Sequence, residues 1–367
     1  MSDQNFQIFL ACLPGLEPVL ADEARALGLP DPVAVPGGVE TSGDWNKVWR
    51  ANLWLRGASR VLVRIGEFRA MHLAQLDKRA RKFPWGDFLR ADVPVKVDAI
   101  CARSKIYHKG AAAQRVERAI SETLGAPIDA GAALRLMVRI EDDLVTLSLD
   151  TSGEGLHKRG HKLATGKAPL RETMAALFLR QMGYDGTQPV LDPMCGSGTF
   201  VIEAAEIAAG LAPGRTRSFA FEQFASFDAR AWKKMRATSS TLAKPQFFGF
   251  DRDQGAIRNS QQNAERAGVA ECTRFVCQPL GALERPDTPP GLVMVNPPYG
   301  ARISSPKLLY GLYASLGEVL KTQMKGWRVG LVTSDRKLAH VTGLNLTPGP
   351  LLPHGGLKVQ LFQSAPL

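Results

Sequence analysis

Residues 192–199 combine an acid, two glycines and a hydroxyl between an apolar strand pattern and an apolar helix pattern, in the order D-P-M-C-G-S-G-T. Gly196 and Gly198 would let the backbone approach a ligand closely because they carry no Cβ. The free N–H groups at the start of the helix would attract an anion. Asp192 would repel a pyrophosphate but suit an ammonium group, and the sequence has no G-x-x-x-x-G-K-[ST] loop here. These features favour a ligand with both an ammonium and a carboxylate, such as S-adenosylmethionine.

Residues 296–300 read N-P-P-Y-G and follow the buried-strand pattern L-V-M-V. Two consecutive prolines, Pro297 and Pro298, make the backbone rigid and have no N–H donor, so this stretch presents backbone carbonyls as acceptors. Asn296 adds a neutral side-chain acceptor. Such acceptors suit the two hydrogens of an exocyclic amine on a base. They would also stabilise the positive charge that the nitrogen gains when it is methylated. Tyr299 could stack on that base once the base has left its helix.

Asp251 ends the strand pattern F-G-F-D, and Arg252 follows it. In a nucleotide-binding fold, an acid at this place accepts hydrogen bonds from ribose hydroxyls. The alternative role, capping the next helix, suits Asp253 better. The two motifs and Asp251 each follow a predicted strand, so we expect them to meet at the carboxyl edge of one parallel sheet, where ligands bind.

The elements that would position these residues form an α/β pattern after residue 168. A helix is expected from Pro169 to Met182, and later helices over 199–210, 254–267 and 307–323. Strands are expected over 189–195, 246–251, 273–277, 292–295 and 328–333, and residues 344–363 read as a hairpin. This pattern predicts a mostly parallel sheet with an antiparallel C-terminal hairpin.

The front half predicts two smaller α+β units. In residues 1–55, a strand over 6–13 and a helix over 16–27 precede short extended pieces in 31–43. The second unit would contain strands over 61–69 and 93–101, helices over 73–83 and 111–124, and a hairpin of 134–140 with 144–150. Residues 152–168, which are rich in glycine and basic side chains, read as a linker.

The chain has 367 residues, a formal net charge of +11 and a pI of about 9.6, which indicate a polyanionic partner such as nucleic acid. Lysines and arginines near aromatic residues could track phosphates while the rings stack on bases. Phe83 and Trp85 lie close to the first group of these residues. The predicted RNA-binding residues are Lys78, Arg79, Arg81, Lys82, Lys105, Lys109, Lys158 and Arg159.

The five cysteines are odd in number and contain no C-x-x-C pair, which indicates buried free thiols in a reducing compartment. His157 and His161 are four residues apart among glycines and basic residues. We interpret both as loop or nucleic-acid-facing residues, and expect no metal site. The sequence shows neither a signal-peptide pattern nor an apolar run of membrane-span length, so we expect a cytoplasmic protein.

Several stretches resemble known motifs. Residues 192–200 and 296–300 resemble the cofactor and catalytic motifs of amino-methylating, class I S-adenosylmethionine-dependent methyltransferases. Three further stretches resemble the THUMP-domain RNA methyltransferases, in particular the bacterial 23S rRNA guanine-N2 methyltransferase (RlmL-type) family: S-G-E-G-L-H-K-R-G-H at 152–161, A-P-L-R-E-T at 168–173 and F-A-F-E-Q-F at 219–224.

This resemblance implies an α/β fold in which a ferredoxin-like region (1–55) and a THUMP RNA-binding domain (56–155) precede a linker (156–168) and a Rossmann-like methyltransferase domain (169–367). It implies S-adenosylmethionine as the cofactor and 23S rRNA or a pre-ribosomal particle as the partner. The residues implied for the cofactor are Asp192, Pro193, Cys195, Gly196, Gly198, Thr199, Asp251, Arg252, Gln278 and Asn296. Asn296, Pro297 and Tyr299 would hold the target amine. The sequence departs from the pattern at Gln278, where many class I methyltransferases carry an acid that faces the adenine amino group.

Other functions fit parts of the pattern. N6-methylation of adenine in RNA or DNA needs the same exocyclic amine chemistry, so N-P-P-Y does not distinguish it from guanine N2. Methylation of a protein glutamine would use the same motif, but the basic front half argues against it. A non-catalytic rRNA-binding or assembly factor is a further alternative, and the intact glycines, Asp251 and Asn296 argue against it.

Overall fold

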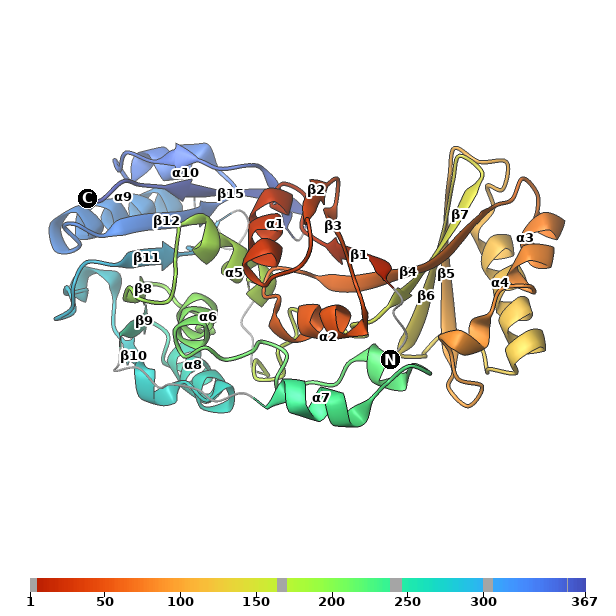
Figure 1. Cartoon of the computed structure of the whole chain (residues 1–367). Coiled ribbons are helices and arrows are strands. Elements are labelled where there is room, and N and C mark those ends of the chain that lie inside the picture. The colour runs from red at the N-terminus through yellow and green to blue at the C-terminus, as the bar shows by residue number, and fades with distance from the viewer. Residues whose placement is uncertain (1–4, 164–169, 238–245, 300–305, 355) are drawn as a thin grey trace. The chain divides into compact units, whose positions relative to one another are not determined.

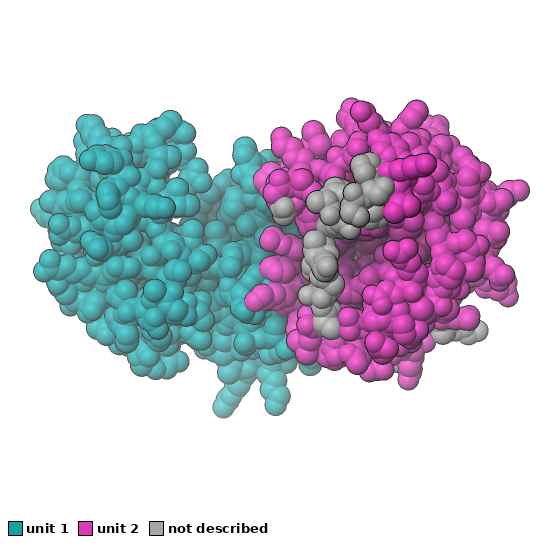
Figure 2. Space-filling view, turned by 180° about the vertical axis from the view of Figure 1, so that it is seen from behind, with its two compact units in different colours: residues 1–12, 21–156, 214–237 teal, residues 13–20, 157–213, 238–367 magenta. Residues whose placement is uncertain are grey.

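The computed structural model describes residues 5–163, 170–237, 246–299, 306–354 and 356–367 (Figure 1). The chain forms two compact units, which Figure 2 colours separately. The first comprises residues 1–12, 21–156 and 214–237, and the second comprises 13–20, 157–213 and 238–367. Within the described ranges, no helix combines the length and apolar character needed to cross a membrane.

The first unit contains a seven-stranded sheet with the order β2-β3-β1-β4-β7-β6-β5. All neighbours are antiparallel except β5 and β6. The strand β4 is long enough to pair with β1 over its first half and with β7 along most of its length, so one sheet runs through both predicted front units. The strands are β1 (Phe6–Ala11), β2 (Val33–Val35), β3 (Gly38–Gly43), β4 (Arg60–Arg69), β5 (Val95–Ala102), β6 (Leu134–Glu141) and β7 (Leu144–Asp150).

Three helices lie where the sequence predicted them: α1 (Glu17–Ala26), α3 (Leu73–Ala80) and α4 (Lys109–Leu124). The helices α1 and α3 are shorter than predicted, and α4 begins two residues earlier. The sequence analysis missed α2 (Trp45–Trp54). The Asp44 side chain caps it by accepting a hydrogen bond from the Lys47 N–H at 2.9 Å, and Val48, Trp49 and Leu53 are buried. The cap and the buried apolar face were readable signals for this helix.

Residues 214–237 belong to the first unit although they lie inside the region predicted as one methyltransferase domain. They form a short 3₁₀ turn, η2 (Ala220–Gln223), and the helix α7 (Ala229–Arg236). Phe221 stacks on Trp49 of α2 at a ring distance of 5.8 Å and meets Trp232 edge-on at 4.9 Å. The F-A-F-E-Q-F stretch is therefore part of an aromatic core in the first unit, and the predicted region 169–367 is interrupted.

The second unit contains an eight-stranded sheet with the order β10-β9-β8-β11-β12-β15-β13, and β14 pairs with β15. Five strands are parallel, and β15 runs antiparallel to β12, which confirms the predicted Rossmann-like sheet with its C-terminal hairpin. The strands are β8 (Val190–Asp192), β9 (Phe247–Asp251), β10 (Thr273–Cys277), β11 (Leu292–Val295), β12 (Arg328–Thr333), β13 (Thr347–Pro348), β14 (Leu352–His354) and β15 (Leu357–Gln363).

Helices α5 (Glu172–Gln181), α6 (Thr199–Ala208), α8 (Gln254–Ala267), α9 (Pro306–Gln323) and α10 (Arg336–Val341) belong to this second unit. The sequence analysis missed α10. The start expected for α5 at Pro169 lies outside the described residues, and the helix begins at Glu172. The strand order changes direction between β8 and β11, which in such sheets creates the crevice for a ligand.

Candidate active site

Four strand ends bring the predicted site residues to one edge of the second sheet. Asp192 ends β8, Asp251 ends β9, Gln278 follows β10 and Asn296 follows β11. These strands are parallel neighbours, and the register pairs Asp192 with Gly249 and Asp251 with Cys277. The expectation that the motifs meet at the carboxyl edge is therefore correct.

The glycine turn is fixed by hydrogen bonds to the strand beside it. The Gly196 N–H donates to Asp251 Oδ2 at 3.0 Å, and the Cys195 N–H donates to the Phe250 carbonyl at 2.8 Å. Gly196 has φ of +55° and Gly198 has φ of +80°. A Cβ on Gly198 would come within 3.2 Å of the Phe275 ring, whereas a Cβ on Gly196 would meet nothing within 4 Å. The turn thus needs glycine for its conformation, and the space beside Gly196 is open to a ligand.

Asp251 links this turn to the following helix. Its Oδ1 accepts from the Asp253 N–H at 3.0 Å, and Asp253 itself caps α8 through the Gly255 N–H at 2.8 Å. The capping role was therefore assigned to the right residue. The predicted contacts of Asp251 and Arg252 with a ribose stay predictions.

Asp192 is 3% exposed and accepts a hydrogen bond from the Met194 N–H at 3.0 Å. Burial raises the pKa of this carboxyl well above its ordinary value, and the nearby Asp251 raises it further. A bound cation would offset both effects, which fits an ammonium ligand. Burial also raises the pKa of the Cys195 thiol well above its ordinary value, so Cys195 is a neutral lining residue and not a thiolate nucleophile.

Gln278, the residue predicted to face the adenine of the cofactor, has no side-chain partner in the described part of the chain that fixes its oxygen toward the site. The Gln278 N–H donates to the Asp251 carbonyl at 2.9 Å, and its side-chain amide nitrogen donates to the Ala282 carbonyl at 3.3 Å. This orientation leaves the side-chain oxygen, the atom expected to accept from adenine, outside that bond. Pro193 and Thr199 flank the glycine turn as the sequence placed them.

The side-chain oxygen of Asn296 is the most informative atom of the site. It is buried, and no hydrogen-bond donor reaches it from the parts of the chain that the structure describes. The Pro298 carbonyl, two residues further on, has a donor within the chain, because the Tyr313 hydroxyl of α9 lies 3.4 Å from it and 3.3 Å from Thr333 Oγ1. Sequence reasoning missed Tyr313. A buried amide oxygen without a donor is poised to accept from a ligand, because leaving it unpaired costs free energy.

Tyr299 does not present the open ring that base stacking requires. Its side chain is 1% exposed, next to residues outside the described range. Stacking of Tyr299 on a target base therefore stays a prediction, and it requires the ring to become accessible when the base enters.

Two linker residues, the predicted RNA-binding Arg159 and the loop residue His161, are buried. The guanidinium of Arg159 is 2% exposed and lies 3.3 Å from Glu203 Oε1 on α6. His161 is 5% exposed, with Nδ1 3.8 Å from Glu206 Oε1. Burial lowers the pKa of His161, so this side chain is predominantly neutral near pH 7. The assignment of Arg159 to an RNA-facing surface is wrong, because Glu203 of α6 holds its guanidinium inside. His161 does lie in a loop, as one of its two interpretations held, but its side chain is buried and does not face outward.

Most of the other predicted RNA-binding residues are exposed. Arg81 differs because it lies 2.8 Å from Asp77 and 2.6 Å from Glu122, so part of its charge is neutralised. Trp85 is buried and donates to the Ala80 carbonyl at 2.8 Å, so it cannot stack on a base. Sequence reasoning missed Tyr107, which is 83% exposed. The exposed cations are Lys78, Arg79, Lys82, Lys105, Lys109 and Lys158.

All five cysteines are free: Cys12, Cys195 and Cys272 are buried, Cys101 is half-buried, and Cys277 is exposed. The expectation of buried thiols is therefore correct for three of them. Within the described ranges, no group of three or more His, Cys, Asp and Glu side chains could hold a metal ion.

The fold and the site define the class. A parallel sheet with a glycine turn after its first strand, an acid after its second and N-P-P-Y after its fourth is the arrangement expected of a class I methyltransferase. Two family models match the chain: the RMKL-like methyltransferase domain over residues 159–347 and the RlmL ferredoxin-like domain over residues 7–62. The chain belongs to the RMKL-like methyltransferase family, and the prediction of a S-adenosylmethionine-dependent methyltransferase is confirmed at the level of that family.

Similar proteins agree with this assignment. A ribosomal RNA large subunit methyltransferase K/L of Syntrophotalea carbinolica is 36% identical over 98% of this chain and 53% of its own length, so the chain spans about half of this curated relative. The crystal structure of a predicted N6-adenine-specific DNA methylase from Listeria monocytogenes is 33% identical with a TM-score of 0.88, covering 99% of this chain and 97% of that chain. SMU.472, solved in complex with SAH, is 28% identical with a TM-score of 0.87, covering 100% and 99% of the two chains.

Proposed function

We propose that the chain transfers a methyl group from S-adenosylmethionine to an exocyclic amine of a base in RNA, most specifically N2 of a guanine in 23S rRNA. The observation that carries the amine chemistry is the buried Asn296 oxygen without a described donor, at the sheet edge that also holds Asp192 and Asp251. The open space at Gly196 and the raised pKa of Asp192 fit the cofactor's zwitterionic end.

The chain's own residues would act by positioning and by electrostatics. Bound S-adenosylmethionine would supply an activated methyl group. Asn296 Oδ1 would accept a hydrogen bond from the target amine and orient its lone pair. As the nitrogen becomes cationic, the same oxygen would stabilise the charge in a site where most water is excluded, which makes the interaction stronger than in bulk water. No strong base is needed, because the cationic product loses its proton readily to solvent.

The choice of RNA rests on separate support. The relative from Syntrophotalea carbinolica is named as a ribosomal RNA large subunit methyltransferase, and the chain carries a net charge of +11. The exposed cations of the first unit, such as Lys78 and Lys105, are free to meet phosphates. Guanine N2 is favoured over adenine N6 by the resemblance of the 152–161 and 219–224 stretches. The division into a THUMP domain over 56–155 also stays part of this proposal.

Labelled S-adenosylmethionine is expected to mark 23S rRNA, and nuclease digestion of the product should yield N2-methylguanosine. The assay compares naked 23S rRNA, ribosomal large subunits, tRNA and double-stranded DNA as acceptors, followed by nucleoside chromatography. Label in N6-methyladenosine would assign the second candidate, and label in DNA alone would remove RNA as the substrate. Cofactor binding without any labelled acceptor would favour the non-catalytic binding factor.

Reversing three exposed charges on α3 is expected to weaken RNA binding. Lys78, Arg79 and Lys82 are changed together to Glu, and Arg81 is left in place because Asp77 and Glu122 already pair with it. If the three residues contact phosphates, the slope of log Kd against log salt should fall by about 2, since each single-strand phosphate contact contributes about 0.7. Filter binding or fluorescence anisotropy over a salt series measures the slope.

The matched control reverses three exposed cations of the second unit, Arg258, Lys325 and Lys337, and so makes the same change in net charge. We expect it to lower the salt slope less than the α3 variant does. Equal slopes in the two triple variants would show that α3 makes no specific contact with RNA.

A further inference from the structure

The Tyr313 hydroxyl reaches the N-P-P-Y turn from the helix α9. The Tyr313 side chain is fully buried, and its hydroxyl donates toward two acceptors, the Pro298 carbonyl at 3.4 Å and Thr333 Oγ1 at 3.3 Å. Thr333 ends β12, which is the parallel neighbour of β11, the strand that leads into Asn296. The hydroxyl therefore joins the turn that follows β11 to the carboxyl end of the next strand.

Stability alone does not account for this hydroxyl. It has a single hydrogen, and both of its distances are longer than the roughly 2.8 Å usual for a hydrogen bond between two oxygens. Such long bonds contribute little to the free energy of unfolding, while the buried hydroxyl has lost its contact with water. A phenylalanine would fill nearly the same volume without that cost. We therefore expect the hydroxyl to serve the turn that it contacts.

The two prolines leave the turn one soft backbone dihedral. The rings of Pro297 and Pro298 fix their φ angles at about −65°. A residue that precedes a proline is restricted to extended values of ψ, and this applies to Asn296 and to Pro297. The ψ angle of Pro298 has no such restriction, and rotation about it moves the Pro298 carbonyl and Tyr299 together. The hydroxyl of Tyr313 contacts that carbonyl, so it acts on the angle that the prolines leave open.

We propose that Tyr313 is a positioning residue: its hydroxyl holds the peptide between Pro298 and Tyr299 and so sets the place of the Tyr299 ring beside the methyl acceptor. This role rests on the proposed function, since Tyr299 is the residue expected to face the target base. Asn296 lies before the two prolines, on the rigid side of the turn, so the place of its side-chain oxygen does not depend on the Tyr313 contact.

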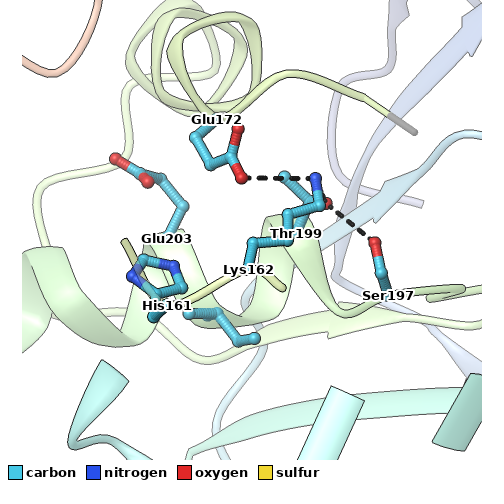
Figure 3. Close-up of a pocket in the computed structure, with 7 residues that line it drawn as sticks. His161, Lys162, Glu172, Ser197, Thr199 and Glu203 are labelled. Carbon is cyan, nitrogen blue, oxygen red and sulfur yellow. Dashed lines mark hydrogen bonds and ion pairs between the residues drawn. The ribbon is translucent and has the colours of Figure 1, made fainter. Parts of the chain in front are cut away.

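The glycine turn on the cofactor side has a separate support. Lys162 Nζ donates to Thr199 Oγ1 at 2.9 Å, and Thr199 Oγ1 lies 3.5 Å from Ser197 Oγ (Figure 3). Lys162 Nζ also lies 3.4 Å from Glu172 Oε1, and both side chains are buried. These contacts involve neither α9 nor β12. A change at Tyr313 should therefore leave the affinity for S-adenosylhomocysteine within about twofold, because distant sites act independently.

Tyr313→Phe removes the hydroxyl and keeps the ring. It should lower the single-turnover rate of methyl transfer about threefold to tenfold, the range expected for one lost hydrogen bond, and should barely change the melting temperature. The acceptor is 23S rRNA, or whichever acceptor takes the label in the assay above, and isothermal titration gives the affinity for S-adenosylhomocysteine. Tyr310→Phe is the matched control, three residues earlier on α9 and 37% exposed, and should leave the rate unchanged.

Combined variants identify the residue through which Tyr313 acts. In a chain that carries Tyr299→Ala, adding Tyr313→Phe should lower the rate by less than about twofold, because the ring that it positions is gone. In a chain that carries Asn296→Asp, the same addition should keep its full effect, because Asn296 lies before the prolines. A loosening of the whole fold would lower the rate equally in both backgrounds, so the comparison separates positioning from a general structural role.

Four results would overturn the role of Tyr313. Equal rates in Tyr313→Phe and Tyr310→Phe would show that the hydroxyl positions nothing, and equal losses in the two combined variants would make it structural. A loss confined to S-adenosylhomocysteine affinity would place its effect on the cofactor. A melting temperature far below that of the unchanged chain would show that the hydroxyl serves stability. If the unchanged chain methylates no acceptor, the proposed function and this role fail together, whereas the other results overturn this role alone.

Discussion

Asn296→Ala is expected to lower the rate of methyl transfer by about 10²–10³-fold while leaving S-adenosylhomocysteine affinity within about twofold. The Asn296 oxygen is buried without a donor among the described residues, so it should gain its partner when the target amine arrives. Its attraction to that amine grows as the nitrogen becomes cationic, so the loss should fall mainly on the transition state. Single-turnover transfer of labelled methyl to RNA gives the rate, and titration with S-adenosylhomocysteine gives the affinity.

Asn296→Asp separates the acceptor from the shape of the side chain, because it keeps an oxygen at the same place. It should retain more activity than the alanine variant if acceptance is what matters. Asn345→Ala, at an exposed position of the same unit, is the matched control and should leave the rate unchanged. A normal rate in Asn296→Ala would contradict the amine-holding role. A parallel loss of rate and S-adenosylhomocysteine affinity would instead make Asn296 a cofactor-binding residue alone.

The sequence predicted the sheet edge of the second unit well because each local signal there agrees with the fold. β10, β11, β12 and α8 have the predicted bounds. Each of these strands is a short apolar run that ends where polar or turn residues begin, and parallel order then brings their carboxyl ends together. The roles of Asp253 as a helix cap and of Gly198 as a turn residue follow from single residues and needed no distant partner.

The burial of charged side chains in the linker could not be predicted in this way, because it depends on partners far along the chain. Arg159 and Lys162 lie in a basic, glycine-rich stretch that resembles a solvated surface, yet Glu203 and Glu172 hold them inside. One signal was readable. Glu203 and Glu206 are acids three residues apart in the otherwise apolar helix T-F-V-I-E-A-A-E-I-A, and buried acids require basic partners.

The sequence did not predict that residues 214–237 belong to the first unit, and the reason is related. A local pattern shows that 219–232 is rich in aromatic residues, but not that they pack against Trp49, which is about 170 residues earlier. The sequence therefore suggested one continuous domain after residue 168. Aromatic side chains in a segment without regular alternation were the available sign of a docking segment.

A chain cut at residue 165 is expected not to fold into a cofactor-binding domain, although the sequence alone placed the domain boundary near there. The cut removes Arg159 and Lys162 and leaves the carboxylates of Glu203 and Glu172 buried without these partners. Breaking a buried pair costs about 3–5 kcal/mol, so two broken pairs approach the whole stability of about 5–15 kcal/mol typical of a domain. The cut also exposes Phe221 and its neighbours, which pack on Trp49. Circular dichroism during heating and titration with S-adenosylhomocysteine measure the outcome.

The matched comparison is a chain that begins at residue 157 and differs from the first by eight residues at its start. It restores both pairs and the His161 carbonyl, which accepts from Arg266 Nε at 2.7 Å, but it exposes the same aromatic residues. It should unfold at a clearly higher temperature than the shorter chain, because a buried carboxylate that has kept its cation does not need to be desolvated alone. Identical melting curves for the two chains would show that the segment 157–164 adds no stability. A shorter chain that melts cooperatively and binds S-adenosylhomocysteine as tightly as the full chain would contradict the argument that these buried pairs hold α5 and α6 in place.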